Sequence, residues 1–152
     1  MASYIPTLCL AGFNAAAIHV GSDTFKLALG TGAVPSANRD GANQYYGGSD
    51  FASEVSGGSY VAGGNTVTLA GANYLVGGLH QYAVANNALS SSWAAVTIAS
   101  ATYAYLYDNT SSPKYIICVW DFGGAQSVTA NTFAVNFTDT TPNYRVWYWG
   151  VT

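Results

Sequence analysis

Short runs of strand-forming residues, separated by turn residues, recur along the whole chain, and this pattern restricts the fold more than any other feature. Val, Ile, Thr and aromatic residues dominate the runs, with 12 tyrosines in the chain, and many of its 17 glycines lie between runs. The predicted strands cover 24–29, 66–70, 79–85, 93–99, 101–107, 114–121, 126–129, 132–137 and 143–149. Because long amphipathic helix patterns are missing, we expect an all-β fold, an antiparallel β-sandwich or a jelly-roll-like domain.

The segments between these runs carry strong turn signals. Residues 108–113 (DNTSSP) contain only turn-favouring residue types, so a hairpin is predicted there. Residues 30–48 contain five glycines and a proline and form the longest predicted loop. Residues 49–55 (SDFASEV) are expected to begin a short helix with Ser49 or Asp50 as its cap.

The chain is expected to form one domain preceded by an arm. Residues 1–22 are predicted to be an extended N-terminal arm with a short strand over 4–10, and residues 23–152 to be the β-sandwich domain. The arm lacks the positively charged start of a secretory signal, so we expect it to belong to the mature protein. No run of 18 apolar residues predicts a transmembrane helix.

Charged residues are scarce, and this argues against two classes of partner. They make up 7% of the chain, and the fixed cations are Lys26, Arg39, Lys114 and Arg145. Four scattered cations form no basic patch, so we expect neither nucleic-acid binding nor a polybasic contact with a membrane surface. A surface poor in charge suits a protein that its neighbours cover, and it also suits an extracellular β-protein.

No group of residues predicts catalysis, a metal site or a cofactor. His19 and His80 have no ligand or base at a suitable spacing, and no nucleophile elbow surrounds any serine. Asp108, Asp121 and Asp139 fall at predicted turns, where aspartate accepts hydrogen bonds from backbone amides. The glycine pairs precede strands rather than helices, so they cannot cradle phosphate. We therefore expect no enzyme activity, no catalytic residues and no cofactor.

Two further groups leave alternatives open. Cys9 and Cys118 are interpreted as small core residues, and a disulfide requires the arm to lie beside the strand that holds Cys118. Tyr103, Tyr105 and Tyr107 share one face of a strand. Packing within the fold is the favoured interpretation, and contact with a neighbouring protein or stacking on a sugar ring are the alternatives.

The segment Ala101–Phe137 (ATYAYLYDNTSSPKYIICVWDFGGAQSVTANTFAVNF) contains the strand and turn pattern A-x-Y-A-x-x-Y-D-x-T, a strand that ends in D-F-G-G, and a Q-S-V-T-A-x-x-F turn and strand. The glycine-rich bend over Ser56–Val67 and the strand Phe25–Leu29 precede it. Over residues 23–137 the chain thereby resembles a family of small virion structural proteins of tailed bacteriophages. The arm and the aromatic C-terminus Trp147-Tyr148-Trp149 depart from the family pattern.

The resemblance implies a virion component without catalytic activity, similar in size and fold to the trimeric cement (decoration) proteins of phage capsids. We therefore expect a homotrimer on the capsid surface, with the major capsid protein as partner. The residues expected at interfaces are Tyr4, Ile5, Leu8, Trp147 and Trp149. A neck, tail or fibre component of the virion is the alternative, and a carbohydrate-binding β-sandwich for host attachment is the alternative from another class.

Overall fold

The computed structural model describes residues 2–35, 43–69, 71–76, 79–84 and 90–136. Its main sheet has five strands in the order β1-β7-β6-β2-β3, and every neighbouring pair is antiparallel. These strands are β1 (Ala2–Tyr4), β2 (Phe25–Gly30), β3 (Asn65–Val67), β6 (Ser91–Asp108) and β7 (Ile116–Val135). A separate antiparallel pair consists of β4 (Gly71–Val76) and β5 (Leu79–Val84). The fold is therefore mostly β, as the sequence predicts.

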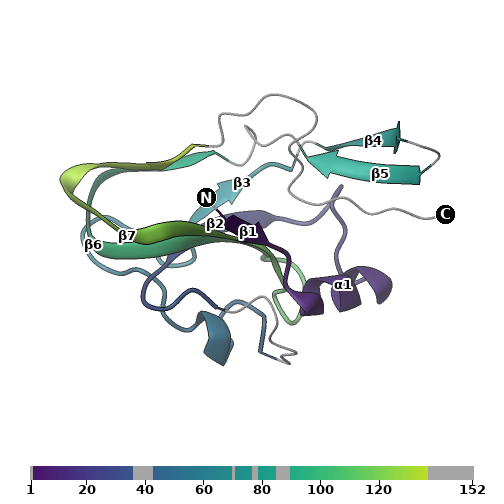
Figure 1. Cartoon of the computed structure of the whole chain (residues 1–152), viewed down its shortest axis with the longest axis horizontal. Helices are drawn as coiled ribbons and strands as arrows, with labels where there is room; N and C mark the ends of the chain where they lie inside the picture. The colour runs from purple at the N-terminus through teal and green to yellow at the C-terminus, as the bar shows by residue number, and fades with distance from the viewer. Residues whose placement is uncertain (1, 36–42, 70, 77–78, 85–89, 137–152) are drawn as a thin grey trace.

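One long hairpin, β6 and β7, forms the centre of the main sheet. The pair bends, so that the half containing the start of β6 and the end of β7 returns over the other half (Figure 1). The ladder has register shifts along this bend, and Ala95, Gly123 and Ala130 have positive φ angles there. Bulges of this kind increase local twist and let a strand pair turn a corner.

The bent hairpin encloses the main hydrophobic core. Leu27, Leu29 and Leu106 come from the flat half of the sheet, and Val96 and Ile98 come from the returning half of β6. All five side chains are at most 1% exposed. The folded-over hairpin thus contributes to both walls of this core, and β2 adds Leu27 and Leu29 to one of them. The jelly-roll arrangement itself stays a prediction.

The segment before β2 packs onto the sheet. β1 pairs with β7 at Ala2–Asp121 and Tyr4–Val119, which places the arm beside the strand that holds Cys118. The prediction of an extended arm with a strand over 4–10 is wrong for α1 (Thr7–Asn14), which is helical. This helix follows Pro6, and its Leu and Ala residues are strong helix formers in a stretch too short to show a helical period.

Other local predictions have mixed outcomes. The expected strands at 24–29 and 79–85 match β2 and β5, whereas β4 was not predicted. The runs 93–99 and 101–107 merge into β6, and the runs from 114 to 137 merge into β7.

The predicted helix at 49–55 is one turn of 3-10 helix, η1 (Ser49–Phe51), and Gly48 occupies the capping position. The strand predicted at 143–149 lies outside the described residues. None of the described helices is long and apolar enough to cross a membrane.

The second face of the sheet is an aromatic layer. Tyr103, Tyr105 and Tyr107 are each at most 1% exposed, and they pack against Phe51 and Tyr46 from the loop that crosses this face. The Tyr46 ring stacks on Tyr107 with centroids 4.4 Å apart. Packing within the fold is thus the correct interpretation of this tyrosine face.

Removal of the hydroxyl group should change the free energy of unfolding differently at two of these tyrosines. The Tyr107 hydroxyl donates to Gly63 O at 2.9 Å, whereas the buried Tyr105 hydroxyl has no hydrogen-bond partner among the described residues. We expect Tyr107→Phe to lower the free energy of unfolding by about 1–3 kcal/mol, because it leaves a buried carbonyl unpaired. Tyr105→Phe should leave stability unchanged or raise it. Urea unfolding of both variants tests this, and equal losses would contradict it.

Candidate functional site

The outer edge of β7 is the most open backbone in the described part of the chain. β1 pairs with β7 only at residues 119–121, and no described strand pairs with that edge from Phe122 to Val135. Residues 123–127 and 129–132 are exposed. Free N–H and C=O groups on such an edge are a template for pairing with another chain.

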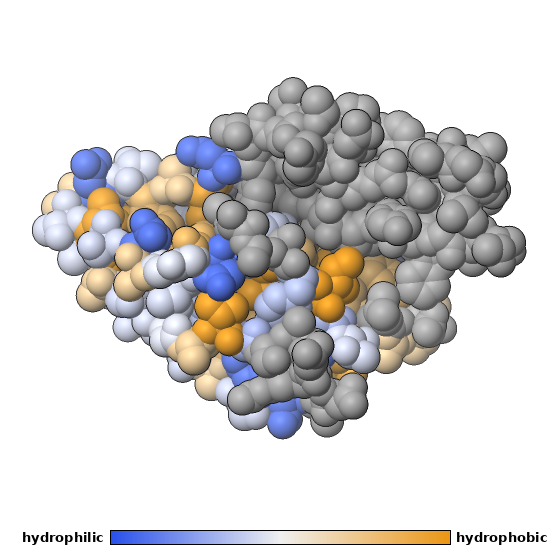
Figure 2. All heavy atoms as spheres, in the orientation of Figure 1, coloured by the Kyte–Doolittle hydropathy of each residue, from blue (hydrophilic) through white to orange (hydrophobic). Residues whose placement is uncertain are grey.

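This edge lacks the side chains that usually protect an edge strand against pairing. Natural edge strands commonly carry lysine, other charges or proline that block association. Residues 122–136 contain none of these, although the glycine pair and Ala130 distort the strand locally. On the face that Figure 2 shows, the coloured surface is mostly pale, with scattered strongly hydrophilic and strongly hydrophobic side chains. The β7 edge is therefore suited to contact with another protein surface.

The opposite edge of the same hairpin is covered by its own chain. The loop over 57–65 lies along the start of β6, where Ser59 Oγ donates to Ala95 O at 2.7 Å. Asn65 Nδ2 donates to Ser92 O and to Ser91 Oγ, both at 2.9 Å. The loop thus closes this edge of β6, and the hairpin presents β7 as its unpaired side.

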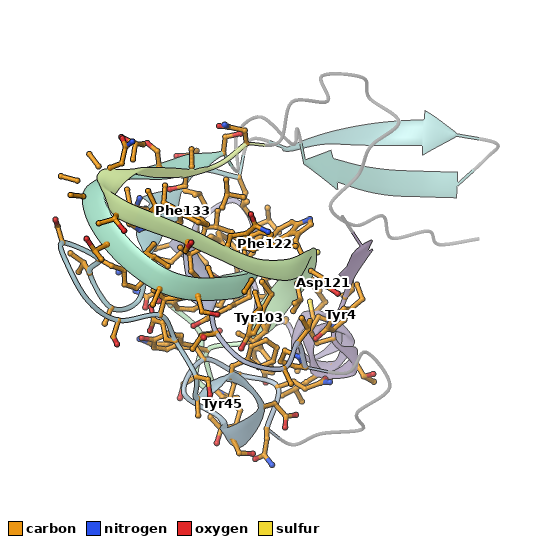
Figure 3. The ribbon with its side chains drawn as sticks, turned by 60° about the vertical axis from the view of Figure 1, so that its left-hand side comes forward. Tyr4, Tyr45, Tyr103, Asp121, Phe122 and Phe133 are labelled. Atoms are coloured by element: carbon orange, nitrogen blue, oxygen red, sulfur yellow. The ribbon has the colours of Figure 1, made fainter. Side chains whose placement is uncertain are left out.

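An aromatic hollow adjoins the open edge. Phe122 and Phe133 lie near each other on β7, with ring centroids 6.3 Å apart, and Phe133 also contacts Trp93 (Figure 3). Both phenylalanines are half-buried and pack against the main core. The hollow is lined by Phe122, Gln126, Phe133, Ala134, Val135 and Asn136. Its rings offer apolar area next to free backbone groups, a combination that a neighbouring strand or loop can use.

A carboxylate organises the loops behind the sheet. Glu54 Oε1 accepts hydrogen bonds from the Tyr60 hydroxyl at 2.8 Å and from Gly63 N at 2.7 Å, and Oε2 accepts one from the Tyr46 hydroxyl at 2.9 Å. The Tyr60 hydroxyl in turn accepts the Leu29 N–H. Burial, followed by the bond to Glu54, raises the pKa of Tyr46 to about 12, so this phenol stays protonated. The cluster has the bonding pattern of a loop anchor.

The cysteines are buried thiols. Cys9 and Cys118 are each 1% exposed, belong to the same core cluster and are free. Burial raises the pKa of the Cys9 thiol to about 12 and also raises the pKa of the Cys118 thiol. Thiolates are the nucleophilic form, so both residues are inert as nucleophiles in this fold. The interpretation as core residues is confirmed.

Asp108 and Asp121 accept hydrogen bonds from backbone amides, as predicted, but Asp121 lies within β7 rather than at a turn. Asp108 Oδ1 accepts hydrogen bonds from the backbone of Thr110 and Ser111, and Asp121 Oδ1 accepts one from Gly123 N at 2.7 Å. Asp139 and the His80 side chain lie outside the described residues. His19 is exposed and lies beside Asp23. Within the described part of the chain, no three His, Cys, Asp or Glu side chains gather where a metal ion could bind.

The residues expected at interfaces have different environments. Tyr4 packs against the aromatic layer, and its hydroxyl donates to Pro35 O. Ile5 packs against the main core, and the Leu8 N–H donates to Gln44 Oε1 at 3.0 Å. All three are half-buried, so contact with another protein stays a prediction. Trp147 and Trp149 lie outside the described residues. Sequence reasoning missed the β7 edge, although its charge-free run is visible in the sequence.

Comparison with family models, with curated proteins and with solved structures found no match for this chain.

The loop that covers β6 depends on Gly58. Its φ is +57°, and a Cβ there would lie 2.6 Å from Thr97 N, whereas Gly32 has a φ of +85° and open space around it. We expect Gly32→Ala to cost about 1–2 kcal/mol from its left-handed backbone alone. Gly58→Ala should cost about 1–3 kcal/mol more, because the loop must move away from β6. Chemical denaturation of the two variants checks this, and an equal cost would show that the loop does not lie on β6.

Proposed function

We propose that this chain is a bacteriophage capsid cement (decoration) protein. It binds the capsid exterior and stabilises contacts between capsomers without catalysis. Its partners are the major capsid protein and further copies of itself in a homotrimer. In this proposal residues 23–152 form a β-sandwich related to the jelly roll, with the bent β6–β7 hairpin as its central element, and residues 1–22 form an N-terminal arm.

The observation that carries the proposal is the open, charge-free edge of β7. A partner strand added to this edge forms main-chain hydrogen bonds. The hollow that Phe122 and Phe133 help to line accepts apolar side chains of the partner. An uncharged edge suits a permanent contact, because buried charges must be paired or they destabilise an interface. A cement protein needs such a contact, repeated over many copies on one particle.

The assignment to a virion rests on the resemblance of residues 23–137 to small phage structural proteins. The motif residues fall at positions that shape the hairpin: Asp108 accepts backbone bonds in its turn, and Gly123 and Gly124 lie at the bend of β7. The motif residues thus shape the backbone of the hairpin, and this supports a structural role for the protein in the virion. The raised pKa values of the buried thiols and phenols also favour a non-catalytic protein.

The test is binding to capsids that lack the protein. The purified chain is mixed with such capsids and sedimented, and the particles are imaged. We expect co-sedimentation and regular density on the capsid exterior. Density only at the neck, tail or fibres would replace the cement assignment with the alternative virion location. Absence of binding to any particle, with retention on a glycan array, would favour the carbohydrate-binding alternative and overturn the proposal.

A pair of lysine variants locates the contact. Ala125 is exposed on β7, and Ala52 is exposed in the loop after η1. Ala125→Lys should weaken capsid binding by about tenfold or more, because a lysine there meets an interface with no partner charge. Ala52→Lys adds the same charge elsewhere and should bind as the parent chain does. Equal binding by both variants would show that the β7 edge is not the contact.

A further inference from the structure

Two buried carboxyl groups meet where β2 begins and β6 ends. Phe25 lies opposite Asp108 in the antiparallel ladder, which brings the residues just before β2 beside the turn after β6. Asn109 N donates to Thr24 O, and Thr24 N donates to Thr110 Oγ1, both at 2.8 Å. These bonds hold the segment that carries Asp23 against the turn that begins at Asp108.

The Asp108 carboxyl group has one satisfied and one unsatisfied oxygen. Oδ1 accepts hydrogen bonds from Thr110 N at 2.7 Å and from Ser111 N at 3.1 Å. Oδ2 is fully buried and receives no hydrogen from any described group, and the whole residue is 0% exposed. An ionised carboxylate accepts hydrogen bonds only, so a buried oxygen without a donor is costly in that state.

The neighbour of Asp108 is a second acid. The Asp23 side chain interacts with the Asp108 carboxyl group and is only 7% exposed. Two ionised carboxylates repel each other and have no hydrogen to share. One proton between them turns the repulsion into a bond.

We propose that Asp108 is protonated in the folded protein and that its Oδ2 donates a hydrogen bond to the ionised carboxylate of Asp23. In this arrangement both oxygens of the Asp108 carboxyl group form hydrogen bonds. Oδ1 of the neutral acid is its carbonyl oxygen and accepts the two backbone bonds of the turn, and Oδ2–H finds its acceptor. The bond fastens the chain ahead of β2 to the β6–β7 turn, and we call this pair the acid clasp.

The charged surroundings agree with these protonation states. Asp23 Oδ2 accepts the His19 N–H at 2.6 Å and lies 3.6 Å from His19 Nδ1, so its negative charge has a donor and a potential cation. Asp108 accepts two backbone hydrogen bonds but forms no ion pair with a described residue. Lys114, from the turn, donates to Asn109 Oδ1 at 2.9 Å, and the Lys26 ammonium of β2 lies near Gly63. Burial, and then the contact with Asp23, raises the pKa of Asp108, although two backbone bonds oppose this.

The clasp makes the free energy of unfolding depend on pH, and the direction follows from the raised pKa of Asp108. The unfolded chain releases the Asp108 proton near pH 3.9, the ordinary value for aspartic acid, and the folded chain holds it to higher pH. Between these two values the folded state binds more protons than the unfolded state. The stability that the Asp108 proton contributes therefore declines as the pH rises through the raised pKa of Asp108.

The direct test is a carboxyl carbon NMR titration of the full-length protein labelled at aspartate. The Asp108 signal should titrate above pH 3.9 in the parent chain. In Asp23→Asn, the amide can donate to Asp108 Oδ2, so the same signal should titrate at lower pH than in the parent. An Asp108 signal that already titrates below pH 3.9 in the parent chain would overturn the clasp.

Urea unfolding gives a second readout. Asp108→Asn places an amide donor where the acid proton lies, so this variant should keep the parent stability at pH 4 and lose less of it toward pH 8. If calcium chloride at pH 8 raises the unfolding midpoint of the parent but not of Asp108→Asn, a cation rather than a proton joins the two acids, and the proposal fails. These outcomes do not depend on capsid binding.

Discussion

Pairing between β6 and β7 is the interaction on which the other parts of this fold depend. The two strands supply the aromatic face through Tyr103, Tyr105 and Tyr107 and the aliphatic face through Leu106, Val96 and Ile98. β1, β2 and the loop at 57–65 each attach to this hairpin, and the loop also contacts β2 through the Tyr60 hydroxyl and through the β2–β3 pair. A two-stranded ribbon is marginal alone in water, so the bend that lets the hairpin cover its own core is essential to its stability.

Buried polar groups determine how the loops fit this hairpin. Glu54 gathers donors from three loop residues, and the Tyr107 hydroxyl reaches Gly63 O through the aromatic layer. A charge-poor chain has few such groups, so each one specifies a large part of the loop arrangement. From Phe122 to Val135, no described segment covers the β7 edge in this way. Polar contacts thus close one side of the hairpin and leave the other side for a partner, in agreement with the proposed role.

Local patterns predicted the parts of this fold that local physics determines. The hairpin turn at 108–113 and the strand β2 follow from turn chemistry and alternation in a few residues. The continuity of β6 was not predictable in this way, because Ala95 adopts a positive φ that no residue preference signals. The helix α1 was missed because eight residues are too few to show a period. The open edge and the acid clasp require strand order, which brings Asp23 beside Asp108 across the sequence.

The position of β1 has a consequence for how the chain is made. β1 lies at the very start of the sequence, and it pairs with residues 119–121 of β7. A ribosome therefore releases this strand long before its partner exists, and closing so large a loop is entropically costly. The main sheet can be completed only after β7 has been made. Until then β1 is an unpaired strand that is available to chaperones, or to a neighbouring nascent copy that offers the same β7 edge.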